Sequence, residues 1–212
     1  YYESGKFLSR MVQVAYNRGV NDFLIDTNLF STKDNLIMNI GTGLKGKKNN
    51  PLRIVVEGYA ENFFSDIEFL DIIMNGQETE GGLTRAKHTK CVFNGLARDS
   101  AMVGLRDCTL IFNGKSKNCG AYLQSCYIEF NDDCRGVGYE ISDCRIYLNK
   151  GIASLFNTSG PRCDVYLTPM SKIEGGVSLS HGRILSKDYD QLRQVYNIHN
   201  DWAMMDSFNR VI

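Results

Sequence analysis

The sequence predicts an all-β fold, a right-handed parallel β-helix, for this single-domain chain of 212 residues. Three observations predict it. A short phrase recurs every 18 or 19 residues, apolar and polar residues alternate within it, and glycine, asparagine and aspartate separate successive phrases. A unit of this size cannot bury its own apolar face, so the repeated units must stack on one another.

Four cysteines mark the repeat, and each opens a phrase with small or apolar residues at its first, third and fifth positions. The phrases are Cys108-Thr-Leu-Ile-Phe, Cys126-Tyr-Ile-Glu-Phe, Cys144-Arg-Ile-Tyr-Leu and Cys163-Asp-Val-Tyr-Leu. This alternation is typical of a strand with one buried face. The same pattern gives seven coils between Leu52 and Thr168. We expect Leu110, Ile128, Ile146 and Val165 to stack in one inward column.

A second, shorter strand is expected before each cysteine. Its inward residues are Ala101, Val103 and Leu105 in one coil, Ala121 and Leu123 in the next, and Val137, Tyr139 and Ile141 after that. The sequence therefore predicts two inward-facing strands per coil. A doubly wound α/β fold is excluded because no helical stretch of about 10 residues fits inside the period. A β-sandwich does not require the same residue at the same phase of every repeat.

The two ends of the chain have helical periodicity instead. Phe7, Met11 and Val14, together with Leu8, Val12 and Ala15, give residues 1–19 a broad apolar helix face, and Gly19 is a helix-stop signal. Three- and four-residue spacing recurs through 187–212 in Leu192, Val195, Ile198, Trp202, Met205 and Phe208. An open solenoid exposes its core at each end, so we expect both helices to cap the coils of residues 20–186.

The composition limits the cellular location and the classes of partner that we expect for this chain. Lysine and arginine together number 24, as do aspartate and glutamate, so no net charge draws the chain to nucleic acid or to a membrane. Lys45, Lys47 and Lys48 form the only dense basic group and are expected in a solvated turn, because no aromatic residues interleave with them. No apolar run reaches the roughly 20 residues that span a bilayer. Seven cysteines, an odd number, suggest reduced thiols in a cytoplasmic protein, although a removed leader before Tyr1 stays open.

The cysteine column invites a metal hypothesis, which its geometry disfavours. Zinc needs four ligands around one point, whereas residues stacked in a straight column about 4.8 Å apart cannot enclose an ion. There is no Cys-x-x-Cys pair, and His88, His181 and His199 are scattered. We therefore expect the column to pack as core. Cys119 and Cys134 lie outside it and are the better candidates for exposed, reactive thiols.

Two further columns follow from the period. Asn75, Asn94, Asn113, Asn131 and Asn149 end successive strands, where asparagine tolerates a left-handed corner and stacked amides can bond from coil to coil. The outward positions hold a mixed, tyrosine-bearing strip that is either a binding surface or the ordinary composition of a strand. The strip comprises Thr109, Tyr127, Arg145 and Asp164 beside Ile111, Glu129, Tyr147 and Tyr166.

No residue is assigned a catalytic, cofactor-binding or metal-binding role. Carboxylate pairs such as Asp132 and Asp133 can act in polysaccharide-active β-helices, but neither this pair nor the group Asp66, Glu68 and Asp71 recurs on one face. The segment from Gly41 to Gly46 lacks the Gly-Lys-Ser/Thr ending of a phosphate loop.

Three segments resemble a known family. Arg18-Gly-Val-Asn-Asp-Phe-Leu-Ile25, Asn39-Ile-Gly-Thr-Gly-Leu-Lys-Gly46 and Leu52-Arg-Ile-Val-Val-Glu-Gly58 are similar to the glycine-repeat (GXGXG) β-helix domain that closes the large subunit of glutamate synthase. Relatives of that domain occur as separate archaeal chains and in formylmethanofuran dehydrogenase. The resemblance is recognisable over residues 7–82, and the rest of the chain resembles the family only in the period of its repeat.

In that family each coil carries paired glycines before an Ile-x-Val strand and another glycine after it. The later glycine is kept at Gly58, Gly76, Gly95 and Gly114, whereas the pair is replaced by Asp107-Cys108, Ser125-Cys126 and Asp143-Cys144. The resemblance implies a single-stranded right-handed β-helix that is a non-catalytic spacer, with no catalytic residues to carry over.

The sequence thus favours a non-catalytic structural or interaction module without a cofactor. Its expected partner is another protein or a second copy, bound through a β-helix face or through the C-terminal helix, whose Trp202, Met205 and Phe208 are residue types enriched at interfaces. The alternatives are a glutamate-synthase-related subunit and a carbohydrate-active β-helix enzyme.

Overall fold

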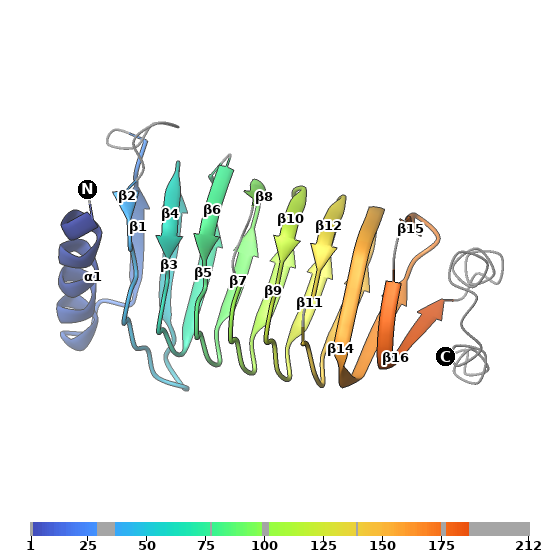
Figure 1. The fold of residues 1–212 in the computed structure, drawn as a ribbon. Coiled ribbons are helices and arrows are strands. Elements are labelled where there is room, and N and C mark those ends of the chain that lie inside the picture. The colour runs from blue at the N-terminus through green and yellow to red at the C-terminus, as the bar shows by residue number, and fades with distance from the viewer. Residues whose placement is uncertain are drawn as a thin grey trace.

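The described residues form a rod of stacked parallel β-coils with helix α1 (Tyr2–Asn17) at one end (Figure 1). This computed structural model describes residues 2–28, 37–76, 78–98, 102–138, 140–174 and 177–186. The expected C-terminal helix over 187–212 lies outside the described residues, as do Ala101 and Tyr139. The described part of the chain contains no helix with the length and apolar character of a bilayer-spanning segment.

Two runs of strands form most of the coil walls, and neighbours within each run are parallel. The first face consists of β1 (Asp22–Asp26), β3 (Leu52–Glu57), β5 (Leu70–Met74), β7 (Lys90–Phe93), β9 (Thr109–Phe112), β11 (Tyr127–Phe130) and β13 (Arg145–Leu148). The second face consists of β2 (Ile37–Met38), β4 (Ala60–Phe63), β6 (Glu78–Gly82), β8 (Leu96–Arg98), β10 (Ser116–Cys119) and β12 (Cys134–Val137). The long β14 (Gly151–Leu167) continues both faces, and β15 (Ser171–Ile173) and β16 (Val177–Ser186) pair with it.

The register of the first face confirms the predicted repeat. Leu110, Ile128, Ile146 and Val165 are consecutive partners and are all buried. The same column runs back through Cys91 and Ile72 to Ile54, with steps of 18 or 19 residues throughout. The seven predicted coils are therefore stacked strand on strand, and β1 and β16 add one rung at each end.

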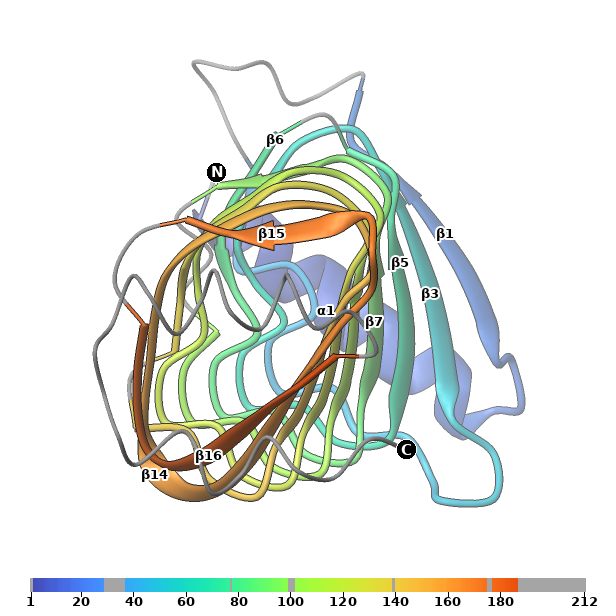
Figure 2. The same cartoon turned by 90° about the vertical axis from the view of Figure 1, so that its right-hand side faces the viewer.

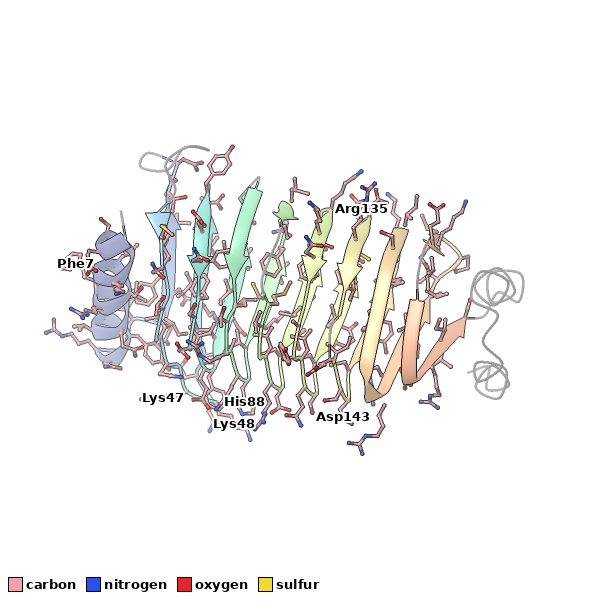
Figure 3. All side chains as sticks on the ribbon, in the orientation of Figure 1. Phe7, Lys47, Lys48, His88, Arg135 and Asp143 are labelled. Carbon is pink, nitrogen blue, oxygen red and sulfur yellow. The ribbon has the colours of Figure 1, made fainter. Side chains whose placement is uncertain are left out.

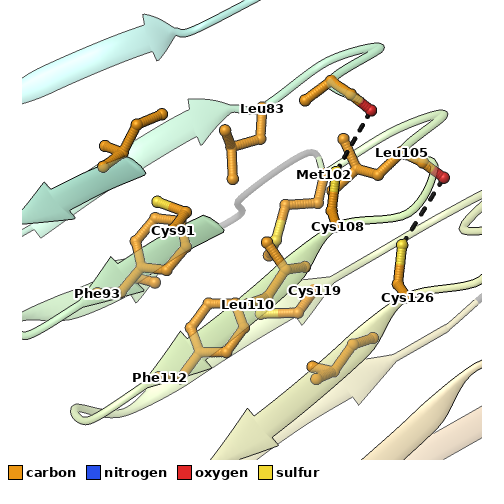
Figure 4. Packing of buried hydrophobic residues seen from close by; sticks show 14 of the residues in the cluster. Leu83, Cys91, Phe93, Met102, Leu105, Cys108, Leu110, Phe112, Cys119 and Cys126 are labelled. Atoms are coloured by element: carbon orange, nitrogen blue, oxygen red, sulfur yellow. Dashed lines mark hydrogen bonds between the residues drawn. The ribbon is translucent and has the colours of Figure 1, made fainter. Parts of the chain in front are cut away.

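The coils superpose when the rod is viewed along its axis (Figure 2). Columns of apolar side chains fill the interior that the coils enclose. The rings of Phe93, Phe112 and Phe130 stack along the axis, with centroids 4.8 and 4.9 Å apart. Figure 4 shows Phe93 and Phe112 beside Cys91 and Leu110 in this core. Because each coil supplies the same kind of side chain to each column, burial depends on the neighbouring coils.

Each coil contains two strands, as predicted, but the second strand follows the first-face strand, and the segment before each cysteine belongs to a third face. The second face was missed because its strands bury their first and last residues instead of alternating, as β10 and β12 show. Asn118 in β10 and Gly136 in β12 have positive φ, which interrupts the period-two pattern. Cys119 is consequently an inward residue of a strand that the sequence pattern hides.

The third face is the short strand predicted before each cysteine, and it is reduced to isolated parallel bridges. Val103 pairs with Ala121 as the spacing requires. Strict alternation fails, however, because Gly104 has a φ of +70°. The buried residues are therefore Met102 and Leu105, rather than Val103 and Leu105.

Helix α1 closes the open edge of the first coil. The Gln13 side chain bonds both backbone groups of Lys45, donating to its carbonyl at 3.1 Å and accepting from its N–H at 2.8 Å. Ser9 Oγ accepts from the Gly41 N–H at 2.8 Å. The helix ends as predicted, because Val20 and Gly19 donate to the carbonyls of Ala15 and Tyr16. The N-terminal cap thus satisfies backbone groups that a bare sheet edge leaves open.

The asparagine column bonds coil to coil as expected. Asn94, Asn113, Asn131 and Asn149 each donate Nδ2 to the amide oxygen of the preceding asparagine, at 2.7 to 2.9 Å. The expected left-handed conformation is wrong for these residues, because none of them has positive φ. The left-handed corner lies instead just before each first-face strand, at His88, Asp107, Ser125, Asp143 and Arg162.

Candidate functional site

The third face carries a charged outer surface built from two outward columns. One holds Asp66, Arg85, Gly104 and Tyr122, all with positive φ. The other holds Lys45, Glu68, Lys87, Arg106, Gln124 and Ser142, which are consecutive parallel bridge partners. The residue between the columns points inward in each coil and is Ile67, Ala86, Leu105 or Leu123, all buried. The buried residues fix the backbone, and the charged residues face outward around them.

A pocket of about 310 Å³ opens between these columns, lined by Lys45, Asp66, Arg85, Lys87, Gly104 and Arg106. We call it the basic pocket. Its lining residues come from four consecutive coils. Gly104 leaves the column position between Arg85 and Tyr122 without a side chain, and a Cβ atom there would meet only Arg85 Cγ, at 3.6 Å. The absence of a side chain at this position therefore helps to keep the pocket open.

One ion pair organises the wall of the basic pocket. Arg85 donates Nε and Nη2 to the two carboxylate oxygens of Asp66, both at 2.6 Å. This hydrogen bonding lowers the pKa of Asp66, and the charges of Arg85 and Lys45 act in the same direction. Asp66 is therefore ionised at neutral pH and holds the Arg85 guanidinium against the wall.

The cations of the pocket outnumber its carboxylates. Lys45 lies 3.8 Å from Glu68, which leaves that pair loosely associated. Within the described ranges of the chain, the exposed side chains of Lys87 and Arg106 form no ion pair with an acidic residue. With Glu68 beside Lys45 included, four cations stand against two carboxylates, so the depression has a net positive charge. Guanidinium groups suit bidentate contacts to carboxylate, phosphate or sulfate.

Of the basic group Lys45, Lys47 and Lys48, only Lys45 lines the pocket in the structure. Lys45 joins the pocket, whereas Lys47 and Lys48 lie outside its lining, at the same side of the rod as His88 and Asp143 (Figure 3). The pocket residues Lys87 and Arg106 were missed, because they are far from Lys45 along the chain. Extending the period through the third face would have found them, since Glu68, Lys87 and Arg106 are 19 residues apart.

The candidate carboxylates do not form a facing pair. Asp66 and Glu68 bind cations of the third face. Asp71 lies on the first face, in register with Arg53 and Lys90. Asp133 accepts from the Ile152 N–H at 2.9 Å and pairs with Lys115 at 3.0 Å, and both contacts lower its pKa.

All seven cysteines are reduced and buried. The expectation that Cys119 and Cys134 are exposed is wrong, because both are inward residues of the second face, only 3% and 1% exposed. Burial raises the pKa of the Cys91 and Cys134 thiols, which disfavours the reactive thiolate. Three other thiols each donate a hydrogen bond to the backbone carbonyl two residues earlier, at 3.2 to 3.3 Å. The pairs are Cys108 with Arg106, Cys126 with Gln124 and Cys144 with Ser142.

The outward strip of the first face is in the predicted register. Its tyrosine rings contact one another, with centroids 5.0 Å apart for Tyr127 and Tyr147 and 4.4 Å for Tyr147 and Tyr166. Burial and the hydrogen bond to Glu129 raise the pKa of Tyr127 to about 12. The nearly parallel rings of Tyr147 and Tyr166 cover each other on one side, whereas the Tyr127 ring is tilted by 33° against Tyr147.

The glycine segment from Gly41 to Gly46 forms the first rung of the third face. The N–H groups of Gly43 and Gly46 donate to the carbonyls of Ser65 and Glu68, both at 2.8 Å. These donors are used within the β-coil, so they do not cradle a phosphate as a nucleotide-binding loop does.

Comparison with known proteins adds no relative: no family model, no curated protein and no solved structure matches this chain. The basic pocket is therefore interpreted from its own residues.

Proposed function

We propose that this chain is a non-catalytic β-helix binding module whose basic pocket holds an anionic group of its ligand. The observation that carries the proposal is the convergence of Lys45, Arg85, Lys87 and Arg106 on one depression of about 310 Å³. The ligand class is defined by a carboxylate, phosphate or sulfate group, because these groups match the geometry and charge of paired guanidinium and ammonium donors.

A binding role is favoured over catalysis by the state of the carboxylates. A glycosidase needs two carboxyl groups on either side of a sugar, one of them able to donate a proton. Asp66 is bound by Arg85, and its pKa is lowered, which suits a permanent counter-charge rather than an acid. The carbohydrate-active alternative therefore has less support than simple binding.

The relation to the glycine-repeat β-helix of glutamate synthase is part of the proposal. It is supported by the positive φ of Asp107, Ser125 and Asp143, which occupy the first of the two positions where that family has paired glycines. A right-handed winding of the coils is included, since β-crossover-β connections are overwhelmingly right-handed. A cytoplasmic location is included as well, and is supported by seven cysteines in the reduced state.

Inorganic phosphate is the probe for the first test, with binding followed by amide chemical shifts of the full chain. We expect the signals of Lys87, Gly104 and Arg106 to move together and to saturate. Replacing Arg106 or Lys87 by glutamine should weaken binding about tenfold each, since a hydrogen bond to a charged group is worth about 1.5–3 kcal/mol. Lys172→Gln removes an exposed lysine of β15, which does not line the pocket, and should leave the affinity unchanged.

The shape of the pocket gives an independent test. Gly104→Asn should reduce phosphate binding without unfolding the chain, because asparagine tolerates the left-handed conformation and its side chain occupies the open position. Equal phosphate affinity in the native chain and in the Arg106→Gln and Lys87→Gln variants would overturn the proposal. Shifts centred away from Gly104 would do the same.

A further inference from the structure

Helix α1 has an apolar outer face that its role as a cap does not explain. Its inner face buries Ser9, Val12 and Tyr16 against the first coil. On the opposite side Phe7, Met11 and Val14 are 65%, 54% and 50% exposed. Phe7 projects away from the rod in Figure 3. A terminal cap is expected to have a polar outer surface, so this stripe departs from the usual pattern.

The exposed apolar residues lie in one row along the helix, and a charged residue flanks the row at each end. Glu3, Phe7, Met11, Val14 and Arg18 succeed one another at steps of three or four residues, which places them on one face. Glu3 is 83% exposed and lies 3.8 Å from Lys6. Arg18 is exposed and has no acidic partner among the residues that the structure describes. The stripe thus carries a negative charge at its start and a positive charge at its end.

We infer that the outer face of α1 is a dimer interface, formed by two copies of this chain whose α1 helices pack antiparallel. A two-fold axis between Arg10 and Met11 puts Phe7 of one copy opposite Val14 of the other. The same axis puts Glu3 opposite Arg18. An isologous interface requires a surface complementary to itself, and this order of charges and apolar residues fulfils that requirement in the antiparallel direction alone.

The position of α1 permits this contact. The helix forms one end of the rod, so two rods can meet end to end without their coils overlapping (Figure 1). A helix of 16 residues is about 24 Å long, and a single pair of such helices forms a small interface. We therefore expect a reversible dimer with a dissociation constant in the micromolar range. This inference does not depend on the basic pocket, which is lined by other residues.

Sedimentation velocity of the full chain, at concentrations on the order of 1–200 µM, tests the dimer. Met11→Lys should raise the dissociation constant at least tenfold, because the two-fold axis places its ammonium opposite Arg10 of the other copy. Met170→Lys is the matched control: Met170 is 67% exposed in the turn before β15, away from α1, and its replacement should leave the dimer unchanged. Circular dichroism establishes that both variants remain folded.

A charge exchange tests the antiparallel arrangement. Glu3→Arg and Arg18→Glu should each weaken the dimer several-fold, since each places like charges opposite one another. The double variant restores opposite charges and should return to within about twofold of the native constant. A monomer over the whole concentration range overturns the inference. So does a dimer whose dissociation constant is unchanged by Met11→Lys, or a double variant that dimerises more weakly than both single variants.

Discussion

The first and third faces of the coil share one repeat but differ in regularity. On the first face, strands of four to six residues pair in continuous register from β1 to β13. On the third face each coil contributes only isolated bridges, and positive-φ residues such as Asp66, Arg85 and Gly104 interrupt the strand. The regular face holds the columns that the sequence repeats most closely. The irregular face holds the basic pocket, because broken alternation allows an empty position beside charged residues.

The largest expected difference between the faces concerns a buried charge. Cys126→Asp should destabilise the chain by about 3 kcal/mol or more, because Cys126 is only 2% exposed and a carboxylate there has no cationic partner. Gln124→Asp, two residues earlier on the exposed third face, should change stability by less than about 0.5 kcal/mol. Urea unfolding at neutral pH measures both. Similar losses for the two variants would contradict the assignment of buried and exposed faces.

A smaller effect is expected at the edge of the first face. Asn113→Ala removes two amide hydrogen bonds, one donated to Asn94 and one accepted from Asn131. Because these groups are exposed and water can replace each bond, we expect a loss of only about 1 kcal/mol in the free energy of unfolding. Lys90→Ala, on the same face, is the control and should fall within about 0.5 kcal/mol of the native chain. A native-like stability of Asn113→Ala would mean that the asparagine column contributes nothing.

The smallest effect is a pH dependence of the third face. The pKa of Asp66 is lowered in the folded chain, first by its hydrogen bond to Arg85. Its contribution to stability is therefore fully present above the ordinary aspartate pKa of 3.8, and is lost as the pH falls through the lower folded value. Replacing Arg85 by glutamine should raise the pKa of Asp66, as followed by carboxyl carbon NMR. An unchanged pKa would show that the ion pair is not formed in solution.

The sequence predicted the first face well because period-two alternation and an 18- or 19-residue repeat coincide there. Column, register and inward direction all followed for Leu110 and Ile128. The second face could not be predicted in the same way, since Asn118 and Gly136 break its alternation and leave β10 and β12 without a strand pattern. This also explains the error on Cys119 and Cys134.

Of the six residues that line the basic pocket, the sequence singled out Lys45 and Asp66 and did not place them together. Lys45 was identified as part of a dense basic group with Lys47 and Lys48, yet those two lysines do not line the pocket. Lys87 lies in a second basic stretch, Arg85-Ala-Lys-His-Thr-Lys90, which was not singled out, whereas Arg106 stands alone in the sequence. Lys87 and Arg106 become neighbours through the register of the third face. Charge density along the chain therefore finds only part of the pocket. Charge at the same phase of successive coils is the informative quantity.

The uniform step between stacked partners also has a consequence for folding speed. Partners such as Ile128 and Ile146 are 18 residues apart, which is about 0.085 of the 212-residue chain. Relative separations near this value are typical of helical bundles, whereas most all-β domains join strands over about twice that fraction. Each added coil closes a loop of the same short length, so the entropic cost does not grow along the rod. The chain should therefore fold faster than a β-sandwich of equal length, with coils adding successively to those already formed.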